Sequence, residues 1–424
     1  MEKKTSQKAA GATAAAKKTA SSTVAPAAKP GPLRFAHPFY TTTPKAKRTA
    51  IKGVGKGLAE YPSKALLLEK IPPPKRNPLM ILDEIIGAAD AKKIADYGSI
   101  TFQAVGDTGS PDTMTEKISD VMAAEYNISK PESCPAFLFH LGDVNYYDNT
   151  EKGYLQQFYT PYKHYPGKII AIPGNHDGEM VKYDQPGEPS TGQTYSLQAF
   201  VENFCQDVAG VPPAAKTIYR EMIAQPAVYW HLNAPFVDIV ALYSNVADGP
   251  GFISNDNVIG TSQKDWLTET LKSIAKARKQ SRKALILAVH HPPFSGGGHS
   301  PSKDMLADID DCCKTAGIMP DAVISGHSHN YQRFTRFPVG TNMQIPYFVV
   351  GCSGHGVQSV GHADGQKVDD HTFESSLEGY GYLTVIVDKK KITMIFTQVK
   401  EDGSKQPYDK TIVVDLATNQ IVPS

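Results

Sequence analysis

A series of short apolar segments, each stopping at Asp, Asn or His, limits this chain to few folds. Beyond residue 99 these segments read SITFQAVGDTG, AFLFHLGDVNYYD and KIIAIPGNHDG, and later KALILAVHHPPF and DAVISGHSHNYQRF. Near-continuous apolar runs of this length are typical of strands that are buried on both faces of a sheet. The sequence therefore predicts a covered sheet with polar side chains at its strand ends.

Segments with helical spacing lie between these strands. Residues 197–208 and residues 262–281 show the apolar periodicity of helices, the second with Ser262 or Thr261 as its N-cap. AVYWHLNAPFVDIVALYSN predicts two strands joined through residues 233–235, and YLTVIVDKKKITMIFTQV predicts a hairpin near the C-terminus. Strands that alternate with helices indicate an α/β fold in which other layers cover the sheet.

The N-terminal part of the chain differs in composition from the rest. Residues 1–33 consist mainly of Ala, Lys, Ser, Thr and Pro, which offer little to bury, so we expect a disordered basic tail. Residues 1–56 hold twelve Lys and Arg against one acid, whereas the whole chain has a net charge of +1, so the body is acidic. Residues 34–95 are proline-rich and irregular up to MILDEIIGAADAKKIADYG, and we interpret them as a strap plus a helix.

The basic tail is open to more than one interpretation. Its spaced lysines can neutralise phosphates and bind nucleic acid or another polyanion. A solubilising or spacer tail is the simpler interpretation, because the tail contains no aromatic residue. Lys3 and Lys4 followed by AAGATAAA resemble the start of a signal peptide, but Ala, Gly and Thr make a poor apolar core for one. We therefore expect a cytoplasmic location by default, with secretion or a periplasmic location as the alternative.

The composition of the chain excludes several classes of protein. With 41% hydrophobic and 21% charged residues, it is typical of a soluble enzyme or binding protein and not of a fibrous or disordered chain. The five cysteines are scattered and show no CxxC spacing, which argues against a disulfide framework and a thiolate zinc site. No run of 18 apolar residues is present, so we expect no membrane span.

The polar residues at the strand ends are of one chemical kind. Taken singly, GDTG and GNHD are turn patterns, and HHPP and GHSH can be ordinary loops. Taken together and in order, they place oxygen and imidazole donors at five strand ends, which predicts a metal site. The donors are Asp107, Asp143, Asn175 with His176, His290 with His291, and His327 with His329. Donors of this kind without thiolates suit Mn, Fe and Zn.

This donor set is larger than a single ion needs. A dinuclear site holds two cations about 4 Å apart, and an anionic bridging ligand has to offset their repulsion. Asp143 is the candidate for that bridge. Such a pair clamps a phosphate and lowers the pKa of bound water from about 15.7 toward 7, which supplies hydroxide for in-line attack. The predicted chemistry is hydrolysis of a phosphate ester.

The blocks GDTG, GDVNYYD, GNHD, VHHPP and GHSHNYQR resemble, in this order, those of the calcineurin-like metallophosphoesterase superfamily. Tyr146, three positions after Asp143, is similar to the purple acid phosphatase pattern, in which a tyrosine phenolate binds Fe(III). The resemblance runs from residue 99 to about residue 400. It implies a four-layer αββα sandwich with a dinuclear site at the carboxyl ends of the strands, and hence a catalytic domain over residues 96–424.

The resemblance also implies a role for each matching residue. Fe(III) would be held by Asp107, Asp143, Tyr146 and His329, and the divalent ion (Fe, Zn or Mn) by Asp143, Asn175, His290 and His327. His176 would face the substrate phosphate or the leaving group, and His299 would be a second substrate-side histidine. The alternative for His299 is a surface residue in a Gly-rich loop. Tyr147 competes with Tyr146 for the ligand position, and His291 is interpreted as a structural or supporting residue.

Three functions follow from these features. The leading one is an acid phosphatase that acts on phosphate monoesters. The second is a phosphodiesterase of the same superfamily that uses two divalent ions and cleaves cyclic nucleotides or phospholipid headgroups; Tyr146 argues against it. The third is a non-catalytic protein that binds polyanions through its tail. Residues 178–226 form an insertion that is a candidate lid, and neither the natural substrate nor the oligomeric state follows from the sequence.

Overall fold

The computed structural model describes residues 67–110, 114–127, 129–182, 190–255 and 257–424. The predicted disordered tail, most of the predicted strap and part of the predicted insertion lie outside these ranges. All described residues belong to one compact unit. In this described part, no helix has the length and apolar character needed to cross a membrane.

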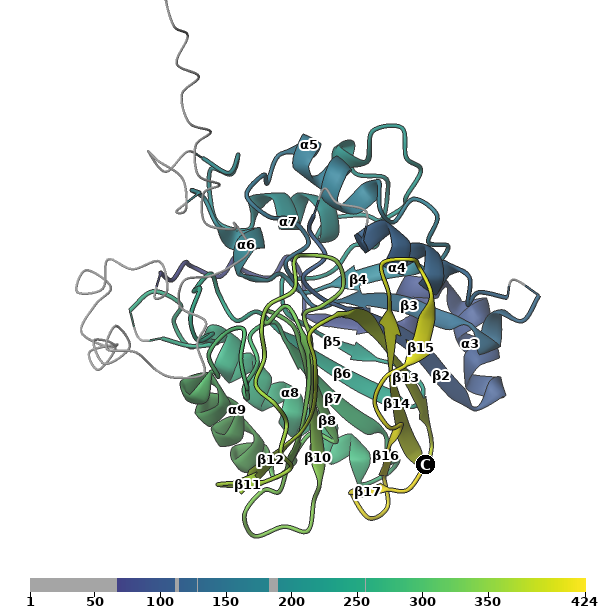
Figure 1. The fold of residues 1–424 in the computed structure, drawn as a ribbon, viewed down its shortest axis with the longest axis vertical. Coiled ribbons are helices and arrows are strands. Elements are labelled where there is room, and N and C mark those ends of the chain that lie inside the picture. Colours follow the sequence, from purple (N-terminus) through teal and green to yellow (C-terminus); the bar gives the residue numbers. More distant parts are fainter. Residues whose placement is uncertain (1–66, 111–113, 128, 183–189, 256) are drawn as a thin grey trace, which may run out of the picture. The chain divides into compact units, whose positions relative to one another are not determined.

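Two mixed sheets form the centre of this unit (Figure 1). The first has nine strands in the order β1-β5-β6-β7-β8-β10-β9-β12-β11. Its strands are β1 (Leu79–Ile81), β5 (Trp230–Asn233), β6 (Val237–Leu242), β7 (Ala284–Val289), β8 (Ala322–Ser325), β9 (Tyr331–Arg336), β10 (Ile345–Val350), β11 (Lys367–Val368) and β12 (His371–Leu377). Strands β6, β7, β8 and β10 run parallel, so the ends of β7 and β8 lie at one edge. The two predicted strands around residues 233–235 are confirmed as β5 and β6.

The second sheet has eight strands, in the order β17-β16-β14-β13-β2-β3-β4 with β15 beside β14. Its strands are β2 (Ser99–Val105), β3 (Pro135–His140), β4 (Lys168–Ala171), β13 (Tyr380–Asp388), β14 (Lys391–Val399), β15 (Lys405–Pro407), β16 (Ile412–Asp415) and β17 (Gln420–Val422). Strands β2, β3 and β4 are parallel, which brings their carboxyl ends to one edge. The predicted C-terminal hairpin is confirmed, since β13 and β14 pair antiparallel.

Helices cover the outer faces of both sheets (Figure 1). Helices α4 (Met114–Ala123) and α7 (Gln198–Phe204) lie over the second sheet, and α8 (Ser262–Arg278) and α9 (Lys303–Ala316) over the first. The other helical segments of the described part are α2 (Leu82–Ile86), α3 (Ala88–Tyr97), α5 (Glu151–Tyr154), α6 (Asn175–Gly178), the 3₁₀ segments η4 (Pro131–Ser133) and η6 (Pro213–Ala215), and the π-helix η5 (Leu155–Tyr159). The predicted helices at residues 197–208 and 262–281 are confirmed as α7 and α8. Thr261 is the N-cap of α8, but its hydroxyl donates to the Asp265 carboxylate instead of capping the backbone.

The burial pattern of the strands shows why there are four layers. In β7, Ile286 packs into the cluster between the two sheets, while Leu285 and Leu287 pack against α8 and α9. In β3, Phe139 faces the same central cluster and Leu138 faces α4. Since successive side chains of a strand point to opposite faces, strands that are apolar at every position need a layer on each side. The α/β fold, a four-layer αββα sandwich, is therefore confirmed.

The region before residue 99 contains one element that the sequence did not predict. Strand β1 pairs parallel with β5, and Met80 lies opposite Leu232. A strand of three residues is too short to show alternation, so its pattern merged with that of the helices that follow. Met80 and Ile94 both belong to the cluster between the sheets, so β1 and α3 are parts of the sandwich interior.

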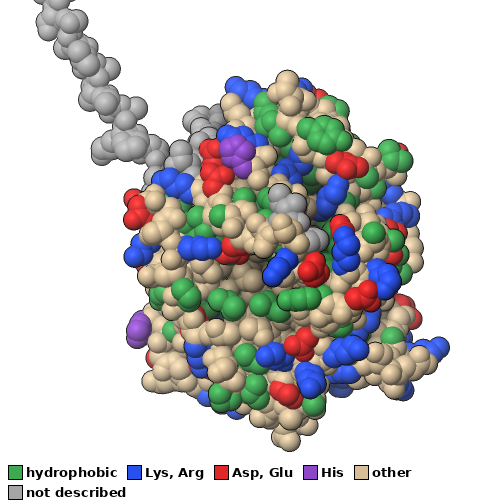
Figure 2. Space-filling model, turned by 90° about the vertical axis from the view of Figure 1, so that its right-hand side faces the viewer, with side chains coloured by type: hydrophobic (Ala, Val, Ile, Leu, Met, Phe, Trp, Pro, Cys, Tyr) green, Lys and Arg blue, Asp and Glu red, His purple; other side chains and the backbone are tan. Residues whose placement is uncertain are grey.

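Charged side chains are distributed evenly over the surface that Figure 2 presents, where Lys and Arg are interspersed with Asp and Glu. Elsewhere in the described part, exposed pairs such as Lys92 with Asp96 and Lys163 with Glu116 lie 2.6 and 2.7 Å apart. Exposed pairs of this kind contribute at most about 1 kcal/mol each. The stability of the fold therefore comes mainly from three apolar clusters. One lies between the two sheets, and the other two lie beneath the helices on the outer faces.

Candidate metal centre

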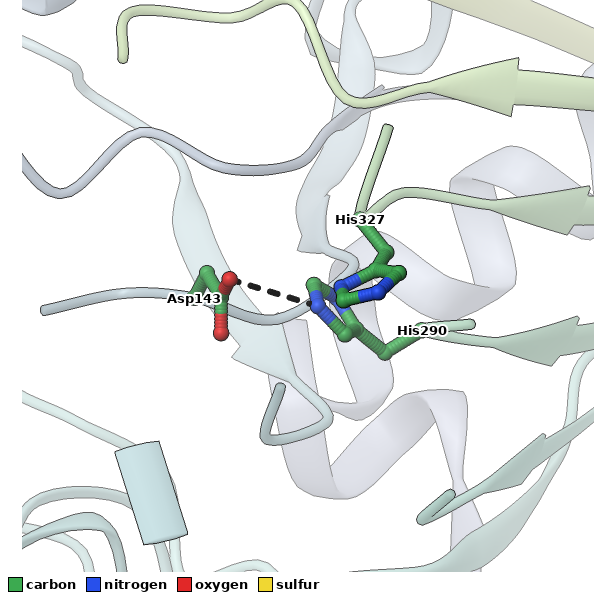
Figure 3. Close-up of side chains that lie close together, drawn as sticks. All are labelled: Asp143, His290 and His327. Atoms are coloured by element: carbon green, nitrogen blue, oxygen red, sulfur yellow. Dashed lines mark ion pairs between the residues drawn. The ribbon is translucent and has the colours of Figure 1, made fainter. Parts of the chain in front are cut away.

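The strand-end loops of the two sheets meet at one place. Asp107 follows β2, Asp143 follows β3 and Asn175 follows β4, while His290 follows β7 and His327 and His329 follow β8. Backbone hydrogen bonds tie neighbouring loops together: the Asp107 amide donates to Gly142 O and the Gly326 amide donates to His290 O. Because the two sheets face each other, donors from one sheet lie opposite donors from the other (Figure 3).

Two groups of potential ligands share one carboxylate. In the first, Asp143, His290 and His327 each offer a donor atom, and these atoms all lie within 4.8 Å of one another. In the second, the same holds for Asp107, Asp143 and His329. All five residues are buried. Figure 3 shows the carboxylate of Asp143 directed at the imidazole of His290, with Oδ2 and Nε2 3.3 Å apart.

Tyr146 lies beside the second group. Its hydroxyl is 3.3 Å from Asp107 Oδ1 and 3.1 Å from His329 Nε2. The neighbouring Tyr147 instead packs edge-on against the ring of His176, at a centroid distance of 5.1 Å. Of the two adjacent tyrosines, Tyr146 is thus the one whose oxygen is next to the donor atoms, as its spacing from Asp143 predicts.

The amide of Asn175 has a defined orientation next to the first group. Its Oδ1 lies 3.1 Å from His290 Nε2, and its Nδ2 donates to Asp248 Oδ1 at 3.4 Å. A buried carboxylate accepts from the amide nitrogen only, so Asp248 turns the carbonyl oxygen of Asn175 toward the cluster. This oxygen is a suitable ligand for a hard cation.

The backbone is strained where the donors enter the cluster. Asp107, Asp143 and His327 have φ angles of 56°, 54° and 68°, which lie in the left-handed region. Such conformations cost about 1 to 3 kcal/mol each for residues other than glycine and persist where the surroundings fix them. Here the His327 amide donates to Asp107 Oδ2 at 2.8 Å, which holds two of the three in place. Strain at three donor positions indicates a functional site.

Glycines make room for the carboxylates. A Cβ on Gly174 would lie 2.2 Å from Asp143 Oδ1, and one on Gly326 would lie 2.5 Å from Asp107 Oδ2. Real Cβ atoms do not approach other atoms so closely, so only glycine fits at either position. The glycines of GNHD and GHSH are therefore part of the cluster's construction.

The electrostatics of the cluster favour bound cations. Burial and the neighbouring Asp143 raise the pKa of Asp107 well above its usual value, although the charge of His290 acts to lower it. Burial alone would also raise the pKa of Asp143, but the charges of His290 and His176 hold it well below its usual value. Burial would lower the pKa of His290, but Asp143 and Asp107 raise it to about 9. Buried carboxylates need positive charge nearby, and cations coordinated by this set would supply it.

The residues present fit a pair of metal ions. Carboxylates, imidazoles, an amide oxygen and a phenol, with one carboxylate in both groups, match the donors that Mn, Fe and Zn prefer. Burial and the charges of Asp143 and Asp107 raise the pKa of Tyr146 well above its usual value. Its phenolate form would therefore need a strongly charged ion next to the oxygen.

The remaining predicted histidines surround this cluster. The His176 amide donates to Asp143 Oδ1 at 2.9 Å, and the His299 ring lies 3.8 Å from that of His327. His299 is only 2% exposed, which excludes the alternative of a surface histidine. Both ring nitrogens of His291 lie within hydrogen-bond distance of protein oxygens, Ser244 Oγ at 2.7 Å and Ala247 O at 2.8 Å. This agrees with the structural role predicted for His291.

Sequence reasoning missed four residues at this place. Glu179 and Asp248 contact His176 and Asn175, His355 stacks on Tyr146, and Gln358 bonds His299. The signal for His355 was present, since it follows the apolar run IPYFVV in the same way that the other donors follow their strands. Glu179 and Asp248 lie in irregular loops, where no periodic pattern marks them.

Comparisons with known proteins relate this geometry to a family. A model of the calcineurin-like phosphoesterases matches residues 100–331. Among solved structures, the purple acid phosphatase PPD1 from yellow lupin seeds is 14% identical with a TM-score of 0.50, over 81% of this chain and 55% of that chain. GAP50, the anchor in the inner membrane complex of Plasmodium, is 12% identical with a TM-score of 0.49, over 74% and 89%.

These structural matches have limits. The chain spans about half the length of the lupin phosphatase, as the 55% coverage shows. A dimetal phosphatase from Danio rerio is 10% identical with a TM-score of 0.43, over 75% of this chain and 99% of that chain. At 14% identity, the likeness to the lupin phosphatase shows a common fold and nothing further. No curated protein matches the chain significantly.

Proposed function

Because this chain belongs to the calcineurin-like phosphoesterase family, we propose that it hydrolyses phosphate monoesters as a purple acid phosphatase-like enzyme. The family supports phosphoester hydrolysis in general. The preference for monoesters is our inference from Tyr146, whose oxygen lies 3.1 Å from His329 Nε2. The observation that carries the proposal is the presence of Asp143 in both ligand groups at once.

The proposed ligand sets follow the two groups. Fe(III) would be held by Asp107, Asp143, Tyr146 and His329, and a divalent Fe, Zn or Mn ion by Asp143, Asn175, His290 and His327. When bound, the two ions clamp the phosphate and activate a water molecule for in-line attack. Every proposed ligand is buried. Gly326 and Gly174 leave the space that the carboxylates of Asp107 and Asp143 occupy.

His176 and His299 are the proposed substrate-side groups. Burial would lower the pKa of His176, but Glu179 and Asp143 raise it to about 9, so its imidazole carries a proton at neutral and acidic pH. It can donate that proton to the oxygen of the leaving group. The ring of His299 contacts that of His327, and Gln358 Nε2 is 3.0 Å from His299 Nε2. The Nδ1 of His299 lies 3.3 Å from Asp248 O, so binding of a phosphate oxygen would use Nε2 in exchange for its contact with Gln358.

One observation favours a second candidate, a phosphodiesterase that uses two divalent ions. The protein's own groups raise the pKa of Tyr146, and a divalent ion is less able than Fe(III) to stabilise the phenolate against them. In that case Tyr146 stays a neutral phenol that donates to Asp107. The two candidates therefore differ in the protonation of one residue.

The test is the visible absorption spectrum of the aerobically purified protein, together with its metal content by mass spectrometry. The proposal expects a purple charge-transfer band and two metals per chain, with the band lost in Tyr146→Phe and kept in the matched control Tyr147→Phe. Activity on p-nitrophenyl phosphate should exceed that on bis-p-nitrophenyl phosphate. A colourless protein with two divalent ions and the reverse substrate preference would favour the phosphodiesterase.

A further inference from the structure

The short helix α6 carries both Asn175 and His176, and side chains from other segments hold its backbone. Gln193 Nε2 donates to the carbonyl oxygens of Asp177 and Glu179, at 3.0 and 2.8 Å. Ser196 Oγ donates to Gly178 O at 2.8 Å. A helix of a single turn has no stability of its own, so these bonds fix where His176 sits.

Glu179 follows this turn directly and points back to it. Its Oε2 lies 2.9 Å from His176 Nδ1, and the side chains of the two residues are only 2% and 1% exposed. Its carbonyl oxygen accepts from Thr191 Oγ1 at 2.6 Å, so the backbone of Glu179 is itself held. The Glu179 carboxylate is therefore held in a fixed, buried position next to the His176 imidazole.

A carboxylate that accepts from one imidazole nitrogen fixes how the ring is turned. With Nδ1–H donating to Glu179, Nε2 is the nitrogen that we assign to the substrate. The ring of His176 also lies 4.4 Å from that of Tyr146, so the imidazole is placed next to the metal centre. Rotation of the ring would move its proton away from the reacting oxygen.

We propose that Glu179 is a positioning residue that fixes the His176 imidazole for proton delivery to the leaving group. This inference rests on the function proposed above. In the step concerned, the oxygen of water forms a bond to phosphorus while the bond from phosphorus to the leaving oxygen breaks. The proton on His176 Nε2 passes to that leaving oxygen, and the proton released by the water returns to solvent. Glu179 touches neither the substrate nor the reacting atoms.

The described residues of the insertion after GNHD have a part in this arrangement. Thr191, Gln193 and Ser196 belong to residues 178–226, and each donates to the backbone between residues 177 and 179. Helix α7 follows them, and Phe200 and Phe204 pack it into the layer beneath. Thr191, Gln193 and Ser196 therefore brace the turn that carries His176.

The experiment compares a good and a poor leaving group in Glu179→Ala, Glu179→Gln and a control, Glu202→Gln. Glu202 makes the same kind of contact on an exposed face, where it accepts from Gln198. The substrates are p-nitrophenyl phosphate and an alkyl phosphate. Only the alkyl leaving group needs a proton, so Glu179→Ala should lose about 100-fold in kcat on the alkyl phosphate and less than about 10-fold on p-nitrophenyl phosphate.

Two further readouts separate positioning from a general structural role. The metal content and the KM of Glu179→Ala should equal those of the wild type, and Glu179→Gln should recover most of the lost turnover because its Oε1 can still accept from Nδ1–H.

The outcomes are distinct. Equal losses on both substrates, or loss of metal from both Glu179 variants, would overturn the inference while leaving the proposed hydrolase intact. Failure of Glu179→Gln to recover turnover would also overturn it. If the metal-loaded wild type hydrolyses neither substrate, the proposed function fails first, and the positioning role falls with it.

Discussion

The imidazole of His355 lies face to face on the phenol ring of Tyr146, with ring centroids 3.7 Å apart and planes 8° from parallel. His355 is held there through its Nδ1, which lies 2.7 Å from Gly109 O. Its position therefore fixes the tilt of the phenol, whose oxygen lies between Asp107 and His329. A residue outside the predicted ligand set thus determines where one of the proposed ligands points.

Removal of this imidazole should loosen Tyr146. We expect His355→Ala to lower the melting temperature and to shift or weaken the charge-transfer band, because the lost ring contact is worth about 1 kcal/mol and leaves a cavity. His355→Phe keeps a ring over the phenol and should retain most of the band. His362→Ala, at an exposed position, is the control. An unchanged spectrum in His355→Ala would show that the stack does not orient the phenol.

Asp143→Asn tests the shared ligand. An amide has no charge to offset the repulsion between two cations, so we expect the variant to lose both bound metals and hydrolysis. Metal content by mass spectrometry and turnover of p-nitrophenyl phosphate are the measurements. Asp207→Asn, whose side chain is 84% exposed, is the matched control. A variant that keeps two metals and full activity would remove Asp143 from the bridging position.

His299→Ala tests the second substrate-side histidine. If the imidazole binds a phosphate oxygen, its loss should lower kcat/KM by about 10-fold or more while the metal content stays at the wild-type value. The exposed His164 offers the control variant His164→Ala. Unchanged turnover would reduce His299 to a packing partner of His327.

Gly174→Ala tests the space around Asp143. The added methyl group would lie 2.2 Å from Asp143 Oδ1 and 2.5 Å from the Asp143 amide nitrogen, so either the loop or the carboxylate has to move. We expect a loss of about 1 to 3 kcal/mol in the free energy of unfolding and a lower metal content. Gly210→Ala is the control, because the nearest atom to its added Cβ is 3.8 Å away. Equal stability and metal content in the two variants would contradict the packing argument.

His140 gives a prediction for pH dependence. Burial lowers its pKa to about 3, so it stays neutral in the folded protein, where its Nε2 lies 2.6 Å from Thr108 Oγ1. In the unfolded chain its pKa is about 6.5. The unfolded state thus takes up the proton first, and the contribution of His140 to stability is complete above pH 6.5 and falls toward pH 3.

The measurement is the free energy of unfolding in urea at pH 7.5, 6.0 and 5.0. The loss due to His140 should approach about 1.4 kcal/mol per pH unit below pH 6, and His140→Gln should flatten the slope. His164→Gln, at an exposed histidine, should leave the slope as it is. Identical slopes in His140→Gln and the wild type would assign the acid sensitivity to other groups.

The sequence by itself determined the local elements and the kind of chemistry. Helix α8 and the hairpin of β13 and β14 follow from periodicity and turn residues within a few positions, and they were predicted with nearly the observed bounds. The donor residues at the strand ends could also be predicted, because Asp or His after an apolar run can be recognised from the sequence alone. Strand β1 was not predicted, because a strand of three residues is too short to show a periodic pattern.

Only the tertiary structure decided which donors meet. Asp107 and His327 are 220 residues apart in sequence and joined by a hydrogen bond, because two facing sheets bring their strand ends together. The sharing of Asp143 between two groups, the burial of His299, and the contacts of Glu179 and His355 all arise in the same way. A sequence pattern predicts on which face of its own helix or strand a side chain lies. Which side chain it meets on the opposite sheet is determined by how the two sheets pack.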